Sequence, residues 1–272
     1  MLVRRSRNLK TQEHVLSPNG HADVSLRIAE TFSSLQGEGL LTGVPSFFIR
    51  TSGCNLRCWF CDTPYASWRP EGERSTINEL IERAVQARMP DADGGPSSAA
   101  RIGHVVLTGG EPLIMKGMTE LATGLRAGGL HVTIETAGTV DVEVPCDLLS
   151  LSPKLRASTP GRGAGPALAD DSRWAELHEQ RRMPIATMRR LIDRAPTTQV
   201  KFVVDSPAEY DEILTVVGDL GVAAADVWIM PQGITVDQLD AAAAWLRPWA
   251  AAAGFQYCDR MQIRWYGNRR GT

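Results

Sequence analysis

The sequence predicts an α/β fold in which helices cover a parallel sheet. Short apolar segments alternate with longer segments of helical periodicity, and strands that are apolar on both faces are typical of parallel sheets. Turns that carry glycine or glutamate follow these strands, as in Thr108-Gly-Gly-Glu-Pro112 and Glu135-Thr136. Such sheets bind their ligands at the carboxyl ends of the strands. Because the sequence offers about six core strands instead of the eight of a closed barrel, we expect an incomplete, TIM-like barrel with its site at that edge.

The first half of the chain follows this alternation. A helix is expected to begin at Ser75 or Thr76, with Glu79 in position for a capping box, and to end near Arg88. Strands are expected over residues 26–32, 45–50 and 104–112, with a second helix over 118–127.

The second half repeats the same order. Residues 174–194 are helical in pattern, and a break is expected at Pro184 because proline interrupts a helix. Strands are expected over 131–138, 147–154, 200–205 and 227–233, helices over 207–219 and 235–252, and a final strand over 255–263 before a basic tail.

The domain organisation follows from composition. Residues 1–23 are polar and aperiodic, so we expect a flexible N-terminal tail. The remaining residues, 24–272, are expected to form a single domain. Two segments near 90–100 and 157–171 are rich in Gly, Pro, Ala and Asp, and they are expected to be loop insertions in this domain.

Composition and charge exclude several classes of protein. The chain has 272 residues, of which 43% are hydrophobic and 22% charged, as in ordinary soluble globular proteins. A net charge of −2 gives no basic field for nucleic acid. No apolar run reaches the ~18 residues of a membrane span, and the basic first residues lack the apolar segment of a signal peptide. We therefore expect a cytoplasmic protein without nucleic-acid or membrane partners.

Three cysteines follow the second strand at the spacing Cys-x3-Cys-x2-Cys. Cys54, Cys58 and Cys61 are one thiolate short of the four that complete a structural zinc site or an ordinary iron–sulfur site. A cubane cluster held by three cysteines keeps one iron free for a small molecule. Cys146 and Cys258 lie far away in strand-like segments and are expected to be buried apolar residues instead of a fourth ligand. The loop thus indicates a reactive cluster, with a three-cysteine zinc site or a redox loop as the alternative.

The sequence resembles the radical S-adenosylmethionine (SAM) superfamily in three features. These are the cysteine spacing, its place after the expected strand 45–50, which is the first strand of the barrel, and the Thr108–Pro112 turn. The resemblance implies the radical SAM fold and a [4Fe–4S] cluster whose open iron chelates the amino and carboxylate groups of SAM. Reduction of the cluster would split SAM into methionine and a 5′-deoxyadenosyl radical, which abstracts a hydrogen atom from the substrate.

Further motifs are similar to those of the 7-carboxy-7-deazaguanine synthase family and occur in the same order. The resemblance implies a lyase that converts 6-carboxy-5,6,7,8-tetrahydropterin to 7-carboxy-7-deazaguanine with loss of ammonia, in the biosynthesis of queuosine and other 7-deazapurines. It also implies Mg²⁺, a reductant such as flavodoxin or ferredoxin, and a homodimer. The motifs are Ser34-Leu-Gln-Gly-Glu-Gly39, Phe48-Ile-Arg50, Cys61-Asp-Thr63, Thr108–Pro112, Glu135-Thr136, Ser152-Pro-Lys154, Lys201-Phe-Val-Val-Asp205 and Met230-Pro-Gln232.

The resemblance assigns substrate-binding roles residue by residue. Arg50 would hold the substrate carboxylate through a two-pronged, charge-assisted hydrogen bond and counts with the three cysteines as catalytic. A carboxylate in the loop before the second strand suits the 2-amino group of a pterin. The substrate-binding residues would be Leu35, Gln36, Gly37, Glu38, Arg50 and Thr108.

The resemblance also assigns the cofactor contacts. Thr63 would offer its hydroxyl to Mg²⁺, an ion that retains much of its hydration shell. Phe60 would pack near the adenine of SAM. The residues expected to contact SAM are Phe60, Asp62, Gly110, Glu111, Glu135, Ser152, Pro153, Lys154, Met230, Pro231, Gln232 and Gly233.

Two other functions fit the cysteine loop. A glycyl-radical-enzyme activase shares the spacing, and a non-enzymatic iron–sulfur or zinc protein would need only the loop. The Gln36–Gly39 loop and Arg50 favour a small polar substrate instead. Two features depart from the family: Ala137 stands where an asparagine is common, and the segment 264–272 is longer than expected for a C-terminus that closes over the substrate.

Overall fold

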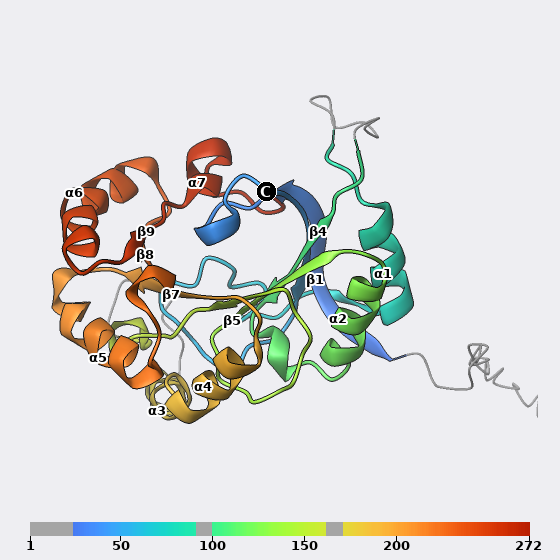
Figure 1. Cartoon of the computed structure of the whole chain (residues 1–272). Coiled ribbons are helices and arrows are strands. Elements are labelled where there is room, and N and C mark those ends of the chain that lie inside the picture. Colours follow the sequence, from blue (N-terminus) through green and yellow to red (C-terminus); the bar gives the residue numbers. More distant parts are fainter. Residues whose placement is uncertain (1–23, 91–99, 162–170) are drawn as a thin grey trace, which may run out of the picture.

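A computed structural model describes residues 24–90, 100–161 and 171–272. Its centre is a curved nine-stranded sheet in the order β3-β1-β2-β4-β5-β6-β7-β8-β9, and among the described residues β3 and β9 form the two unjoined edges (Figure 1). Six neighbouring core strands run parallel, and the two-residue β9 pairs with the last of them in the same direction, which confirms the predicted incomplete barrel. The six core strands are β2 (Pro45–Thr51), β4 (His104–Gly109), β5 (His131–Thr136), β6 (Leu148–Leu151), β7 (Thr198–Val204) and β8 (Val227–Pro231).

Two antiparallel strands extend the sheet beyond β2. β1 (Ser25–Leu35) pairs with β2, and the short β3 (Glu73–Thr76) pairs with β1. The sequence did not predict β3, because Glu73-Arg-Ser-Thr76 is polar and carries none of the apolar alternation that indicates a strand. The expected tail over 1–23 and the central parts of the two expected insertions, 91–99 and 162–170, lie outside the described residues.

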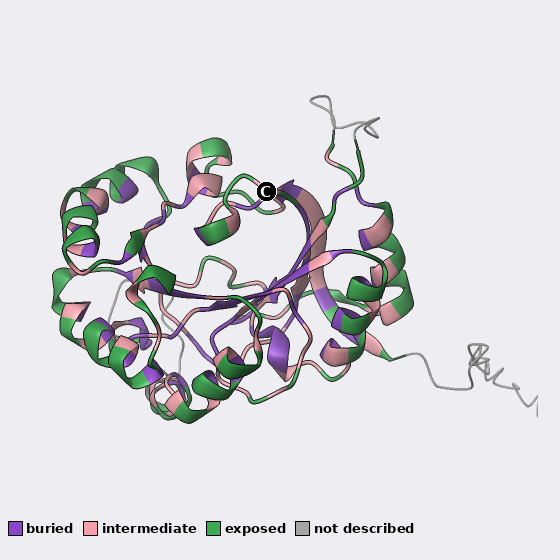
Figure 2. Ribbon diagram, viewed as in Figure 1, coloured by how far each residue is buried: buried purple, intermediate pink, exposed green. Residues whose placement is uncertain are grey.

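Helices cover the outer face of the curved sheet, with their exposed sides turned away from it (Figures 1 and 2). Thr76 caps the first helix and forms the predicted capping box with Glu79, and Pro184 separates α3 from α4 as predicted. The helices are α1 (Ile77–Gln86), α2 (Met118–Ala127), α3 (Asp171–Arg181), α4 (Ile185–Arg194), α5 (Tyr210–Leu220) and α6 (Val236–Ala252), with 3-10 turns η1 (Gly39–Leu41), η2 (Pro112–Ile114), η3 (Arg156–Ser158), η4 (Pro207–Glu209) and η5 (Ala224–Asp226).

Side chains alternate between the two faces of each parallel strand. On β2, Ile49 enters the apolar core under the helices, whereas Arg50 lines a cavity on the concave face. On β7, Phe202 belongs to the core and Lys201 to the cavity. The strands therefore build a dry layer beneath the helices and a polar lining inside the barrel.

The predicted final strand over 255–263 is wrong for most of its length. Only β9 (Gln256–Tyr257) is a strand, and the chain then forms α7 (Met261–Tyr266). The chain turns because Arg260 points inward to Glu38 and to the carbonyl of Gly233, while the Met261 amide donates to the carbonyl of Gly37 (2.9 Å). These contacts replace the ladder that a longer strand would need.

Within the described part of the chain, no helix combines the length and apolar character needed to cross a membrane.

Candidate active site

A cavity of about 520 Å³ opens at the carboxyl ends of the parallel strands, within the size range of small-molecule sites. It gathers most of the predicted site residues from segments far apart in the sequence. The predicted residues that line it are Leu35, Gln36, Gly37, Glu38, Arg50, Cys54, Cys58, Phe60, Cys61, Asp62, Thr63, Thr108, Gly110, Glu135, Ser152, Lys154, Met230 and Gln232.

The three clustered cysteines share one wall of this cavity, and none forms a disulfide. Burial raises the pKa of the Cys54 and Cys58 thiols to about 12 and also raises the pKa of Cys61. Such thiols stay neutral at pH 7 until a cation displaces their protons. Within the described residues, no group of three or more His, Cys, Asp or Glu side chains is arranged to hold a single metal ion. Three free thiols on one wall fit the donor set of a cluster with an open iron.

Glu111 supports the cavity from behind instead of lining it. Its carboxylate is fully buried and accepts hydrogen bonds from Thr136 Oγ1 (2.6 Å) and from the amides of Ala137 (2.8 Å) and Leu113 (3.1 Å). The Glu111 amide donates to the carbonyl of Gly53 (2.9 Å), just before the cysteine loop. Glu111 thereby joins the turn after β4 to the end of β5. The cavity wall, as far as the structure describes it, also excludes Pro153, Pro231 and Gly233.

Gly110 has no room for a side chain. A Cβ atom there would lie 2.1 Å from the carbonyl oxygen of Gly53 and 2.6 Å from that of Ala66. The glycine therefore allows the backbone of the turn after β4 to pack directly against the backbone on either side of the cysteine loop.

Glu38 is the centre of a buried ionic cluster. One carboxylate oxygen lies 2.5 Å from Lys201 Nζ, and the other accepts from Arg260 Nε (3.3 Å) and Gln262 Nε2 (2.6 Å). Burial would raise the pKa of Glu38, but the charges of Lys201 and Arg260 outweigh it and hold the pKa at about 2. Arg260 also forms an ion pair with Asp62 of the cysteine loop. These three donors occupy three of the roughly four acceptor sites of the Glu38 carboxylate, so about one site is left for a ligand.

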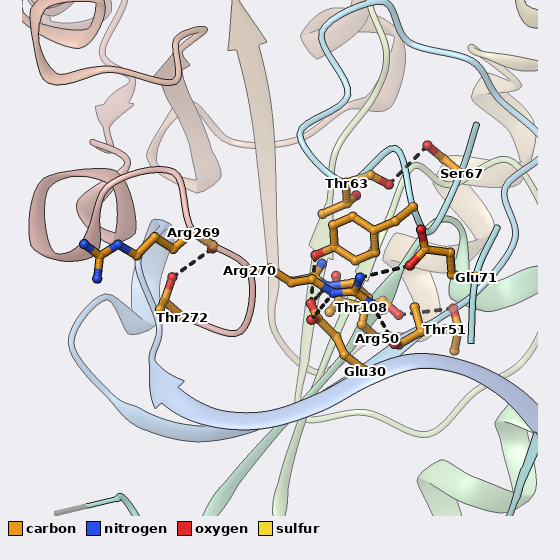
Figure 3. A network of polar contacts seen from close by, with 12 residues as sticks. Glu30, Arg50, Thr51, Thr63, Ser67, Glu71, Thr108, Arg269, Arg270 and Thr272 are labelled. Carbon is orange, nitrogen blue, oxygen red and sulfur yellow. Dashed lines mark hydrogen bonds and ion pairs between the residues drawn. The ribbon is translucent and has the colours of Figure 1, made fainter. Parts of the chain in front are cut away.

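Arg50 is held by Glu30. Oε1 of Glu30 accepts from Arg50 Nε (2.7 Å) and from the Tyr65 hydroxyl (2.8 Å), and Oε2 accepts from Arg270 Nε (3.0 Å). Figure 3 shows Arg50 and Arg270 converging on Glu30, with Thr108 beside them. Burial raises the pKa of Glu30, but the hydrogen bonds from Arg50 and Tyr65 outweigh it, so the pKa is lowered and the carboxylate is ionised. The contact uses Nε, and among the residues that the structure describes the two terminal nitrogens of Arg50 make no hydrogen bond, so they can bind a carboxylate ligand.

The C-terminal segment reaches the same cavity, although it is longer than the family resemblance implies. Residues 267–272 line the cavity. Arg270 donates to Glu71 (2.9 Å) and to the carbonyl of Ala29 (3.1 Å), and its guanidinium lies 4.0 Å from the centre of the Tyr65 ring.

No role was predicted from the sequence for Glu30, Lys201, Arg260 or Gln262. Lys201 carried a local signal, since it is a single charge within the apolar strand Val200–Val204. Arg260 and Gln262 lay in a segment interpreted as a strand, and Glu30 on a strand whose polar residues could equally face solvent.

Comparisons with known proteins agree with this geometry. Residues 48–154 match the family model described as the radical SAM superfamily. The chain is 58% identical to 7-carboxy-7-deazaguanine synthase from Rhodopirellula baltica over 96% of this chain and 95% of the relative. It is 40% identical to the enzyme of that name from Halobacterium salinarum, over 90% and 92% of the two chains. The crystal structure of QueE from Escherichia coli shares the fold, with a TM-score of 0.57 and 22% identity over 87% of this chain and 94% of the other.

Replacing Glu38 with glutamine should lower the free energy of unfolding by about 3–5 kcal/mol at pH 7, because Lys201 and Arg260 would remain buried without their shared partner. The contribution of Glu38 is complete above its ordinary pKa of 4.5 and is lost as the pH falls toward its folded pKa of about 2. Urea unfolding of wild type and variant should therefore differ most near neutral pH, and the difference should shrink below pH 4.5.

Glu71→Gln is the matched control for this measurement. It breaks an exposed ion pair with Arg270, so the expected loss is below about 1 kcal/mol. Similar losses in the two variants would contradict the description of Glu38 as the centre of a buried ionic cluster.

Proposed function

This chain belongs to the 7-carboxy-7-deazaguanine synthase family of radical SAM enzymes, and we propose that it converts 6-carboxy-5,6,7,8-tetrahydropterin to 7-carboxy-7-deazaguanine with loss of ammonia. The observation that carries the proposal is the 58% identity over 96% of the chain. The product serves the synthesis of queuosine or another 7-deazapurine.

Cys54, Cys58 and Cys61 would hold a [4Fe–4S] cluster, and the rest of the same wall would hold SAM. The bound cluster supplies the electron that cleaves SAM to a radical able to abstract hydrogen from the substrate. On the chain's side, Lys154 Nζ donates to Ser152 Oγ (2.7 Å), which places a cation and a hydroxyl together at the end of β6. These two would bind the polar end of SAM, with Gly110 at its amine. The apolar faces of Phe60 and Met230 would hold its adenine, with Asp62, Glu135 and Gln232 as polar neighbours.

The substrate would lie between Arg50 and the loop after β1. Arg50 and Thr108 are paired across β2 and β4 at neighbouring strand ends. Arg50 would bind the carboxylate of the pterin, and Thr108 would contact the edge of its ring. Gln36 donates to Ser46 Oγ (2.9 Å), which fixes the loop over the cavity. Leu35 and the backbone of Gly37 would contact the flat ring. Glu30 would orient Arg50, and Glu38 would present its remaining acceptor capacity to the 2-amino group.

Magnesium is part of the proposal through Thr63. Its side chain lines the cavity next to Cys61, and its hydroxyl oxygen lies 3.8 Å from Cys61 Sγ. A hydroxyl with a substrate carboxylate and water would complete a shell of hard oxygen ligands, as Mg²⁺ prefers.

The proposal extends to the setting of the enzyme. Five free cysteines and an oxygen-sensitive cluster suit a reducing compartment, so we propose the cytoplasm. A flavodoxin- or ferredoxin-like protein would supply electrons. A single radical SAM domain over 24–272 and a homodimer are further proposals supported by the family resemblance.

The main alternative is an activase that acts on a protein backbone. Within the described residues, the two terminal nitrogens of Arg50 make no hydrogen bond, and Arg50 lies in a cavity of about 520 Å³, which favours a small carboxylate substrate instead.

An anaerobic product assay tests the function directly. The protein, reconstituted with iron and sulfide and given dithionite, SAM and the carboxytetrahydropterin, should form 7-carboxy-7-deazaguanine, identified by mass and ultraviolet spectrum. SAM cleavage without this product would favour an activase. No SAM cleavage, together with tightly bound zinc, would favour a non-enzymatic metal protein.

Arg50→Ala should raise the dissociation constant of the pterin by at least about 30-fold, or about 2 kcal/mol, because a buried charge pair loses one partner. SAM affinity, measured by the same titration method, should stay unchanged. Arg50→Lys keeps the charge but loses the planar fork, so it should fall between wild type and Arg50→Ala. An equal loss of pterin and SAM binding would show that Arg50 acts through the fold.

Thr63→Val should abolish the stimulation of turnover by Mg²⁺, since valine matches the shape of threonine but lacks the hydroxyl. Wild type treated with a magnesium chelator should show the same residual rate. Iron content must be equal in both proteins, because Thr63 adjoins Cys61. A variant that still responds to Mg²⁺ as wild type does would place the ion elsewhere.

A further inference from the structure

The cysteine loop, residues 54–61, has two sides. Cys54, Leu56, Cys58, Phe60 and Cys61 line the cavity. The remaining residues, Asn55, Arg57 and Trp59, all bond to the segment formed by η3 and α3.

The main chain of the loop is attached to this segment at three successive points. The Asn55 carbonyl accepts from Arg181 Nη1 (3.2 Å), and the Arg57 amide donates to His178 Nδ1 (3.1 Å). The Trp59 amide donates to the carbonyl of Ser158 (3.1 Å), and its indole donates to that of Ala157 (2.8 Å).

His178 has a single arrangement that satisfies every partner. It is fully buried, and Nδ1 accepts the Arg57 amide, so the proton of the neutral imidazole is on Nε2. Nε2 donates to Ser158 Oγ (2.9 Å), whose own hydrogen goes to the carbonyl of Leu155 (2.6 Å). The side chain at position 178 must therefore accept a hydrogen bond from the Arg57 amide and donate one to the Ser158 hydroxyl.

Arg57 fixes the curvature of the loop between two cysteines. Its side chain is buried, and Nη1 donates to the carbonyls of Cys54 (2.8 Å) and Leu56 (2.7 Å). Its guanidinium lies 4.0 Å from the centre of the Trp174 ring on α3. The main chain from Cys54 to Leu56 thus wraps around one cation that α3 holds in place.

We propose that His178 and Trp174 are positioning residues for the iron–sulfur cluster. They hold Arg57, and Arg57 sets the separation of Cys54 and Cys58. This inference rests on the proposed function only in that the three cysteines hold a cluster. It gives a role to the helix that follows the insertion near 157–171, for which the sequence motifs supplied none.

The test compares cluster retention in reconstituted variants. His178→Leu keeps a side chain of similar size but removes both hydrogen bonds, so an iron chelator should bleach its cluster absorbance about 10- to 100-fold faster than that of wild type. His178→Asn retains a side-chain acceptor for the Arg57 amide and should restore part of this stability. Trp174→Leu removes the ring under Arg57 and should also bleach faster, and it carries the test alone if His178→Leu does not fold.

Gln180→Ala is the control on the exposed side of α3 and should bleach at the wild-type rate. Thermal unfolding of each cluster-free variant separates cluster positioning from loss of the fold. Wild-type bleaching rates in the folded His178→Leu and Trp174→Leu proteins would overturn the inference. An unfolding temperature that falls in proportion to the increase in bleaching rate would also overturn it, because loss of the fold would then explain the loss of the cluster. A wild-type protein that takes up no cluster would instead refute the proposed function.

Discussion

The buried carboxylate of Glu38 constrains the whole carboxyl-end face of the barrel. The sheet ends at β3 on one side and at β9 on the other, so strand pairing in the described residues does not join these sides. Glu38 follows β1, Lys201 lies on β7 and Arg260 follows β9, and their contacts at 2.5 and 3.3 Å connect the two sides. Because a buried charge without partners is costly, these segments can reach their final positions only together. The cysteine loop joins the same cluster through Asp62.

Local sequence patterns predicted the parallel core, and the family resemblance predicted much of the cavity wall. Strands such as Val200–Val204 are recognisable because their apolar pattern repeats within a few residues, and Thr76 with Glu79 marks a helix start in the same local way. The contacts that organise the site are not local. Glu38 and Arg260 are 222 residues apart, and Glu30 and Arg270 are 240 apart. No spacing rule connects such pairs, so the sequence predicts a strand in place of α7 and indicates no role for Glu30.

The two arginines beside the cysteines show why residue type alone could not assign roles. Arg50 lies near the end of a strand and its side chain lines the cavity, whereas Arg57 lies within the cysteine loop and is not part of the cavity lining. Both are mostly buried, and both touch an aromatic ring, Phe32 for Arg50 and Trp174 for Arg57. Their partners separate them, because Arg50 pairs with a carboxylate and Arg57 bonds to the carbonyls of its own loop.

The Glu30 network has an electrostatic consequence for whatever binds at Arg50. Glu30 and Glu71 carry two negative charges, and Arg50 and Arg270 carry two positive charges, so the group is neutral as it stands. A carboxylate that docks on Arg50 brings a negative charge for which this group holds no spare cation. In a partly buried site that excess is poorly screened, so a cation beside the ligand would strengthen its binding. Ligand and cation would then each raise the affinity for the other.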